Sequence, residues 1–195
     1  MDFKEQSYSV LIVSAAEKFN ASLQELFPDL KYYPVQSEAS ISSAKRALLE
    51  REYDFVLINS PLPDGDGVRF ALDISVGKSA VVLLLIRNEL YSEAFFGTYS
   101  YGVYTLPKPT SKQILNQALD WMSSTRERLR RLEKKSLSLE DKMQEIRIIN
   151  RAKWILITEL KMTEADSHRY IEKQAMDRCV SKKEIAEEII KTYAK

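Results

Sequence analysis

The sequence has 195 residues, of which 45% are hydrophobic and 29% are charged, as expected for a globular protein that buries a core. It has no apolar run of the roughly 18 residues that a membrane span needs, and its charged first residues argue against a secretory signal peptide, so we expect a cytoplasmic protein. Cys179 is its one cysteine and His168 its one histidine, which excludes disulfide frameworks, zinc clusters and histidine-dependent triads within one chain.

The formal net charge of +1 conceals a difference between the two parts of the chain. Residues 1–124 carry 11 Lys/Arg and 15 Asp/Glu, a net charge of −4, whereas residues 125–195 carry 18 and 13, a net charge of +5. A basic C-terminal part favours a polyanionic partner, although many helical surfaces are equally basic without binding nucleic acid.

Strand-sized apolar segments alternate with amphipathic, helix-like segments from Tyr8 to about Pro109. The strands are expected at residues 9–13, 31–35, 54–58, 80–85 and 102–106, and the helices near 17–27, 38–51, 67–76 and 89–99. This alternation predicts a five-stranded parallel sheet covered by helices on both faces. Ligands of such sheets bind at the carboxyl ends of the strands, which places a candidate site after Val13, Ile58, Leu85 and Leu106.

The rest of the chain has the composition of helices, because no glycine follows Gly102 and no proline follows Pro109. A helix that begins near Ser111 carries a row of residues at alternating spacings of three and four: Met122, Thr125, Leu129, Leu132, Ser136, Leu139, Met143, Ile146 and Asn150. This heptad row predicts a coiled-coil dimerisation helix over residues 111–150 and a parallel homodimer. The charges of the flanking RERLRRLEKK suit solvent-facing and interhelical positions. The alternative is that the row packs back on the N-terminal domain.

Two shorter helices are expected near residues 164–178 and 182–193. Thr163 with Asp166, and Ser181 with Glu184, have the spacing of helix caps. Together with the end of the long helix, their apolar residues predict a three-helix core: Ile155, Leu156, Ile171, Ala175, Met176, Ile185, Ala186 and Ile189.

The predicted strand ends read VLIVSAAEKF, FVLINSPLPDGDG, VVLLLIRN and YTLPKP, and this pattern resembles the receiver domain of bacterial response regulators. The resemblance implies a flavodoxin-like (CheY-like) fold with an acidic pair for magnesium, a phosphoacceptor aspartate, a Thr/Ser and a lysine. Ser14 and Ala15 stand in place of the acidic pair, Asn59 in place of the acceptor and Leu85 in place of the hydroxyl, and Lys108 alone matches.

Magnesium binding and acyl-phosphate formation both need carboxylates, so these departures predict a degenerate receiver domain over residues 1–124. We expect no catalytic residue, no metal and no cofactor, and Asp64 and Asp66 lie too far along the loop to restore the site. Lys108 is left to pair with another anion or to donate to carbonyl groups. An unknown ligand or partner protein on the receiver remains an open alternative.

The sequence NRAKWILITELKMTEADSHRYIEKQAMDRCVSKKEIAEEII resembles the ANTAR module of AmiR- and NasR-type transcription antitermination regulators. The resemblance assigns residues 142–195 to a three-helix RNA-binding module that recognises stem-loops in leader transcripts. Cations that meet phosphates and flat side chains that stack on bases are its candidate RNA-binding residues: Arg151, Lys153, Trp154, His168, Arg169, Lys173 and Arg178. Taken alone, Trp154 is also compatible with a core position. Ala152, Ala175 and Met176 are assigned to close helix packing.

The sequence therefore predicts a dimeric RNA-binding regulator of transcription antitermination that acts by binding and not as an enzyme, independently of aspartyl phosphorylation. The alternatives are a DNA-binding response regulator and a receiver with a coiled coil used purely for protein interaction. A helix-turn-helix often has a glycine in its turn, and none lies among the C-terminal helices.

Overall fold

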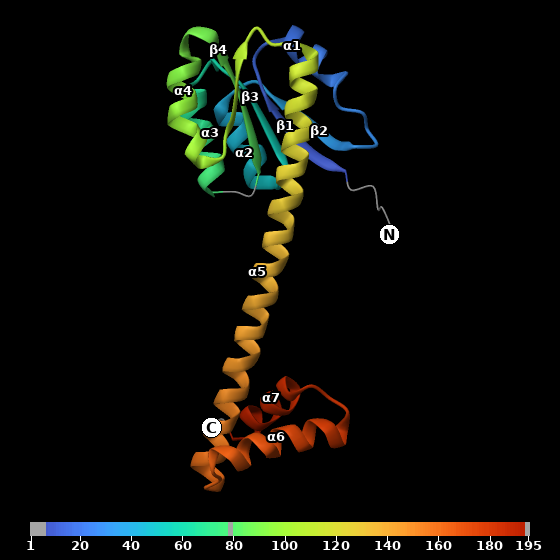
Figure 1. Cartoon of the computed structure of the whole chain (residues 1–195), viewed down its shortest axis with the longest axis vertical. Helices are drawn as coiled ribbons and strands as arrows, with labels where there is room; N and C mark the ends of the chain where they lie inside the picture. The colour runs from blue at the N-terminus through green and yellow to red at the C-terminus, as the bar shows by residue number, and fades with distance from the viewer. Residues whose placement is uncertain (1–6, 78–79, 194–195) are drawn as a thin grey trace. The chain divides into compact units, whose positions relative to one another are not determined.

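The five predicted strands are present in the computed structural model, which describes residues 7–77 and 80–193 (Figure 1). All neighbouring strands pair in parallel, in the order β2-β1-β3-β4-β5. Their bounds are β1 Tyr8–Val13, β2 Tyr32–Glu38, β3 Phe55–Asn59, β4 Val81–Arg87 and β5 Tyr104–Lys108. The prediction of a CheY-like parallel sheet is confirmed.

Helices cover both faces of the sheet, because its central strands consist almost entirely of buried apolar residues. The helices of this unit are α1 Glu17–Gln24, α2 Ile41–Glu50, α3 Gly67–Gly77, α4 Tyr91–Thr98 and the first part of α5 Lys112–Leu160, with short 3-10 helices at Asn88–Leu90 and Tyr99–Tyr101. One core cluster joins the sheet to α2, α3 and α4. A second cluster joins its other face to α1 and α5.

The chain divides into an N-terminal unit that ends at Arg130 and a C-terminal unit that begins at Arg131. Helix α5 contributes to both units. In the C-terminal unit its last turns pack against α6 (Glu164–Arg178) and α7 (Lys182–Tyr193). Their buried core consists of Ala152, Leu156, Ile171, Ala175, Ile185, Ala186 and Ile189.

The predicted caps explain where the last two helices begin. The Thr163 hydroxyl accepts a hydrogen bond from the amide of Asp166 at 3.2 Å. The Ser181 hydroxyl accepts one from the Glu184 amide at 3.2 Å, and the Glu184 carboxylate accepts the Ser181 amide at 3.4 Å, which is the reciprocal capping box.

Two assignments made from helical spacing are wrong. Met176 is 78% exposed, because the neighbouring Ala175 occupies the core-facing position and one residue turns the helix by about 100°. Met122 is completely buried in the core of the N-terminal unit and Leu129 packs against the same cluster. Met122 is therefore not available to a second copy of α5, whereas Leu129 is only partly buried and its part in dimerisation stays a prediction.

Candidate functional site

Three of the residues expected at the strand ends of the N-terminal unit lie together in one hydrogen-bonded group. The Asn59 side chain, at the end of β3, donates to the Ser14 hydroxyl at 2.9 Å. Lys108, at the end of β5, donates to the Asn59 side-chain oxygen at 2.6 Å and to the Ser60 carbonyl. Asn59 and Ser14 are buried, so the amide bridges a hydroxyl and an ammonium where the resemblance leads one to expect carboxylates.

The other two residues of the expected site contribute little to it. Leu85 pairs with Asn59 in the sheet, but its side chain is buried in the core cluster beneath α1 and α5. Ala15 is exposed and offers no polar side chain. The side chains that remain are neutral or, in the case of Lys108, cationic.

The electrostatics of this edge oppose a metal cation. Burial lowers the pKa of Lys108, and the positive charge of Arg87, which pairs with it in the sheet register, lowers it further. Among the residues that the structure describes, no group of three or more His, Cys, Asp or Glu side chains is placed to hold a metal ion. The strand ends therefore lack the hard anionic ligands that magnesium prefers.

The loop carboxylates are engaged elsewhere. Asp64 accepts hydrogen bonds at 2.8 Å from the backbone amides of Ile41 and Ser42, at the start of α2. The Ser42 hydroxyl and these two amides lower the pKa of Asp64. Asp66 accepts the amide of Val68 at 2.9 Å, at the start of α3. Both residues stabilise turns and helix starts rather than the strand-end group.

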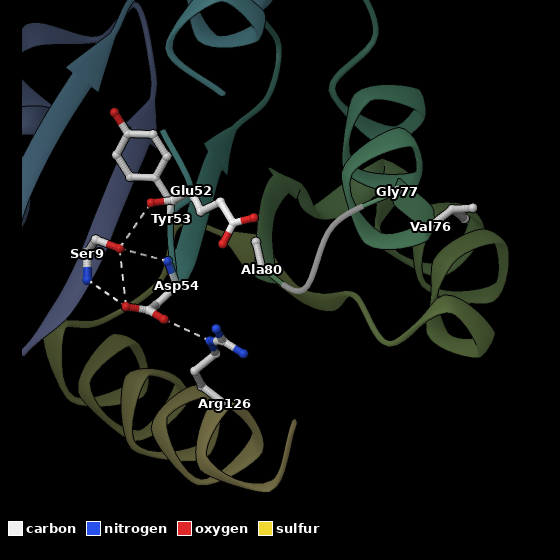
Figure 2. A pocket seen from close by; sticks show the side chains of 8 residues that line it. All are labelled: Ser9, Glu52, Tyr53, Asp54, Val76, Gly77, Ala80 and Arg126. Atoms are coloured by element: carbon white, nitrogen blue, oxygen red, sulfur yellow. Dashed lines mark hydrogen bonds and ion pairs between the residues drawn. The ribbon is translucent and has the colours of Figure 1, made fainter. Parts of the chain in front are cut away.

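A buried ionic cluster at the start of β3 is not anticipated by the sequence (Figure 2). Asp54 is 8% exposed and accepts hydrogen bonds from the Ser9 amide at 3.0 Å and the Ser9 hydroxyl at 3.2 Å. Two arginines of α5, Arg126 and Arg130, each donate to its Oδ1 at 2.8 Å. The cluster ties α5 to the amino edge of the sheet, opposite the strand-end group.

The arginines of this cluster correct the expectation that the charges of RERLRRLEKK occupy solvent-facing and interhelical positions. Their side chains are only 12% (Arg126) and 15% (Arg130) exposed. Burial by itself raises the pKa of Asp54, but the hydrogen bonds from Arg126 and Ser9 and the two positive charges outweigh it and hold that pKa below its ordinary value. The spacing of four between Arg126 and Arg130 was the signal that could have revealed this cluster, because residues four apart share one face of a helix.

The residues predicted to contact RNA lie in the C-terminal unit, and their electrostatic surroundings differ. Lys153 pairs with Glu164 at 3.4 Å and His168 with Glu172 at 3.3 Å. Arg178 donates from two nitrogens to Glu188, at 2.5 and 2.7 Å. The positive charges of Lys153 and Arg178 are therefore partly neutralised by their own unit.

The other predicted cations are unpaired. Within the described ranges, Arg151, Arg169 and Lys173 are exposed and have no carboxylate within 4.0 Å. Arg169 and Lys173 are four residues apart and share one face of α6. Trp154 is 67% exposed, so the core alternative for this residue is wrong. This unit therefore presents free positive charge and an accessible aromatic ring.

An apolar groove of about 910 Å³ also lies in the C-terminal unit, between α5 and the segment that joins α6 to α7. Ile146, Ile149, Ala175, Met176 and Val180 supply its apolar wall. Met176 is exposed because its side chain lines this surface groove rather than the core.

Comparisons with known proteins agree with this division of the chain. Residues 137–190 match the model of the ANTAR domain family. The transcriptional regulatory protein PdtaR of Mycobacterium tuberculosis is 27% identical over 188 residues, a match that covers 94% of this chain and 89% of PdtaR. The chain therefore joins a segment that matches the ANTAR domain family to an N-terminal unit with the fold of a receiver domain.

Solved structures support the receiver fold of the N-terminal unit. A signal receiver domain of an HD domain-containing protein from Pseudomonas fluorescens Pf-5 superposes with a TM-score of 0.59 at 24% identity, covering 67% of this chain and 96% of that domain. A response regulator from Chloroflexus aurantiacus J-10-fl gives 0.52 at 21% identity, covering 60% and 98%. In the part of the chain that the structure describes, no helix is both long and apolar enough to cross a membrane.

Proposed function

We propose that this protein is an ANTAR response regulator that binds stem-loops in leader transcripts and favours transcription antitermination, acting in the cytoplasm by binding and without catalysis. The observation that carries the proposal is the ANTAR match over residues 137–190, on a three-helix unit whose outward cations include the unpaired Arg151, Arg169 and Lys173. Cations of this kind neutralise phosphates, and unpaired loop bases of RNA offer faces and edges for recognition.

We further propose that two copies pair through α5. Leu132, Leu139, Met143 and Ile146 are each more than half exposed and follow the three-and-four spacing of a coiled-coil seam. In a parallel pair with this register, Lys135 of one helix faces Glu140 of the other, an attractive combination of the kind that selects partner orientation. A dimer presents two RNA-binding units, so the second contact benefits from a high effective concentration.

Phosphorylation is not part of the proposed mechanism. The neutral Asn59 amide offers no carboxylate nucleophile, and it is already bonded to Ser14 and Lys108. Control is assigned instead to constitutive dimerisation or to a ligand or partner protein that acts on the receiver domain.

The test compares three nucleic acids in one electrophoretic mobility series at fixed salt: a two-hairpin RNA, a single hairpin and a DNA duplex. The two-hairpin RNA is expected to bind most tightly and the single hairpin more weakly. A preference for the DNA duplex would support the DNA-binding alternative instead. Failure to bind any of the three would favour a protein-interaction role.

A further inference from the structure

The exposed face of α5 around Trp154 combines an aromatic ring with cationic side chains. Ala152 and Leu156 point into the three-helix core. At about 100° per residue, Trp154 lies about 200° around the helix from Ala152, which directs its indole away from that core. A large aromatic ring in this position adds nothing to the packing of the unit, and burying it against a ligand is favourable.

Unpaired cations surround this ring. Arg147 and Arg151 precede Trp154 by seven and three residues, so they share its face of α5, and Lys161 follows directly after the end of the helix. All three are exposed. Within residues 7–77 and 80–193, none of the three has a carboxylate within salt-bridge distance, in contrast to Lys153 and Arg178.

A shallow groove of about 400 Å³ adjoins the indole. It is lined by Asn150, Lys153, Trp154, Ile157 and Glu164. The Asn150 amide carries both donors and an acceptor, and is exposed. Glu164 is the one acidic group in the lining, and Lys153 lies 3.4 Å from its carboxylate, which offsets its charge. An aromatic face, an amide and flanking cations are the elements that recognise an unpaired nucleobase and its phosphates.

We propose that Trp154 stacks on an unpaired loop base of the bound RNA, while Arg147, Arg151 and Lys161 contact the phosphates on either side of that base. This inference rests on the proposed RNA-binding function and deepens it. It adds Arg147 and Lys161 to the contact surface, and it assigns the ion-paired Arg178 a structural role through its contact with α7.

Charge argues against a second copy of α5 as the occupant of this face. In the parallel register described above, Arg147 faces Lys142 of the second copy, and two cations in that position repel. The attractive Lys135 and Glu140 combination lies seven residues, or about two turns, before this point. This repulsion disfavours pairing of the two helices beyond Arg147, and Trp154 lies seven residues further along α5.

The chain offers a matched control for the test, because its other tryptophan, Trp121, is also half exposed on α5 but belongs to the receiver domain. The experiment uses the full chain and a synthetic two-hairpin RNA, with loops enriched from a library of randomised loop sequences. Trp121→Phe leaves Trp154 as the sole tryptophan, and Trp154→Phe leaves Trp121, so emission excited selectively from tryptophan reports one site in each variant. RNA is expected to quench Trp154 emission in the first variant and to leave Trp121 emission unchanged in the second.

Affinity supplies the second readout. Trp154→Ala is expected to weaken RNA binding by roughly 5- to 150-fold, the range that follows from loss of one base–aromatic stack, whereas Trp121→Ala leaves affinity unchanged. An abasic nucleotide at the stacked position should weaken wild-type binding by a similar factor and should not weaken Trp154→Ala further. Circular dichroism of Trp154→Ala checks that the exposed substitution leaves the fold intact.

The outcomes separate the inference from the function on which it rests. Tight RNA binding that is indifferent to both Trp154→Ala and every abasic loop position would overturn the stacking inference alone. No RNA binding by the wild-type chain would overturn the proposed function and the inference together. Trp154 emission that changes with protein concentration in the absence of RNA would identify a second copy as the occupant, which also contradicts the inference.

Discussion

Replacing Asp54 with asparagine removes the carboxylate that holds Arg126 and Arg130 against the receiver domain. Breaking a fully buried ion pair by removing one partner costs about 3–5 kcal/mol, because the remaining charge stays buried without compensation. The two guanidinium groups here are 12% and 15% exposed and Arg130 also pairs with Glu127 at 2.8 Å, so water and this second carboxylate recover part of that loss. We therefore expect Asp54→Asn to lower the free energy of unfolding of the receiver domain by about 2–3 kcal/mol.

Urea unfolding followed by Trp121 fluorescence, in a Trp154→Phe background, reports this domain separately from the C-terminal unit. Asp120→Asn is the matched control, because Asp120 also pairs with a cation, Lys31 at 3.2 Å, but the two side chains are 72% and 43% exposed. Such a surface pair contributes roughly 0–1 kcal/mol. Equal midpoints for the Asp54 and Asp120 variants would refute the reasoning that burial makes the Asp54 cluster strong.

The pH dependence of stability provides an independent check on the same cluster. Because the folded pKa of Asp54 is lowered, its contribution to stability is fully present above the ordinary aspartate pKa of about 3.9. That contribution is lost as the pH falls through the lowered folded value. The difference in unfolding free energy between wild type and Asp54→Asn should therefore be constant near pH 7 and should shrink in acid. A difference that grows as the pH falls would contradict the assigned charge state.

Three further predictions concern the remaining parts of the chain. Incubation with a small phosphodonor and magnesium should add no phosphate to the intact protein, and a phosphorylated species in mass spectrometry would show that the receiver retains its chemistry. The double substitution of Leu132 and Leu139 by Asp should yield monomers in sedimentation, whereas Leu137→Asp, an exposed position outside the seam, should leave the dimer intact. Arg169→Ala should weaken RNA binding and reduce the slope of log binding constant against log salt concentration by about 0.7. Arg178→Ala removes a residue that is paired within its own unit, so it should change the affinity less. A larger effect of Arg178→Ala than of Arg169→Ala would argue against α6 as an RNA contact.

The sheet was predictable because its first, third and fourth strands each carry a short and nearly continuous apolar run between helix-like segments. The helix starts at Thr163 and Ser181 were predictable for a similar reason, since a cap and its partner are three residues apart. Interactions of this range depend on neighbours in the sequence and require no knowledge of the tertiary structure.

The errors arose where a sequence pattern was correct but did not say which part of the molecule packs against the patterned helix face. Heptad spacing along α5 is present, yet Met122 and Leu129 cover the sheet of their own chain, because spacing does not state which apolar surface lies opposite. Arg126 and Arg130 read as solvent-facing charges because their partner, Asp54, lies 72 and 76 residues away in the sequence. The hydrogen-bonded group of Asn59, Ser14 and Lys108 was predicted only in part. Its members were named from the sequence, but their mutual hydrogen bonds follow from the geometry of the sheet.

Transcriptional readthrough tests the central claim most directly. The assay is single-round transcription in vitro on a template whose leader encodes two hairpins that the protein binds, the second of which overlaps an intrinsic terminator. Added protein is expected to raise the fraction of full-length transcripts, and the response should vanish when the loop bases are replaced. Termination that is unchanged at protein concentrations that saturate the leader RNA would contradict a role in antitermination.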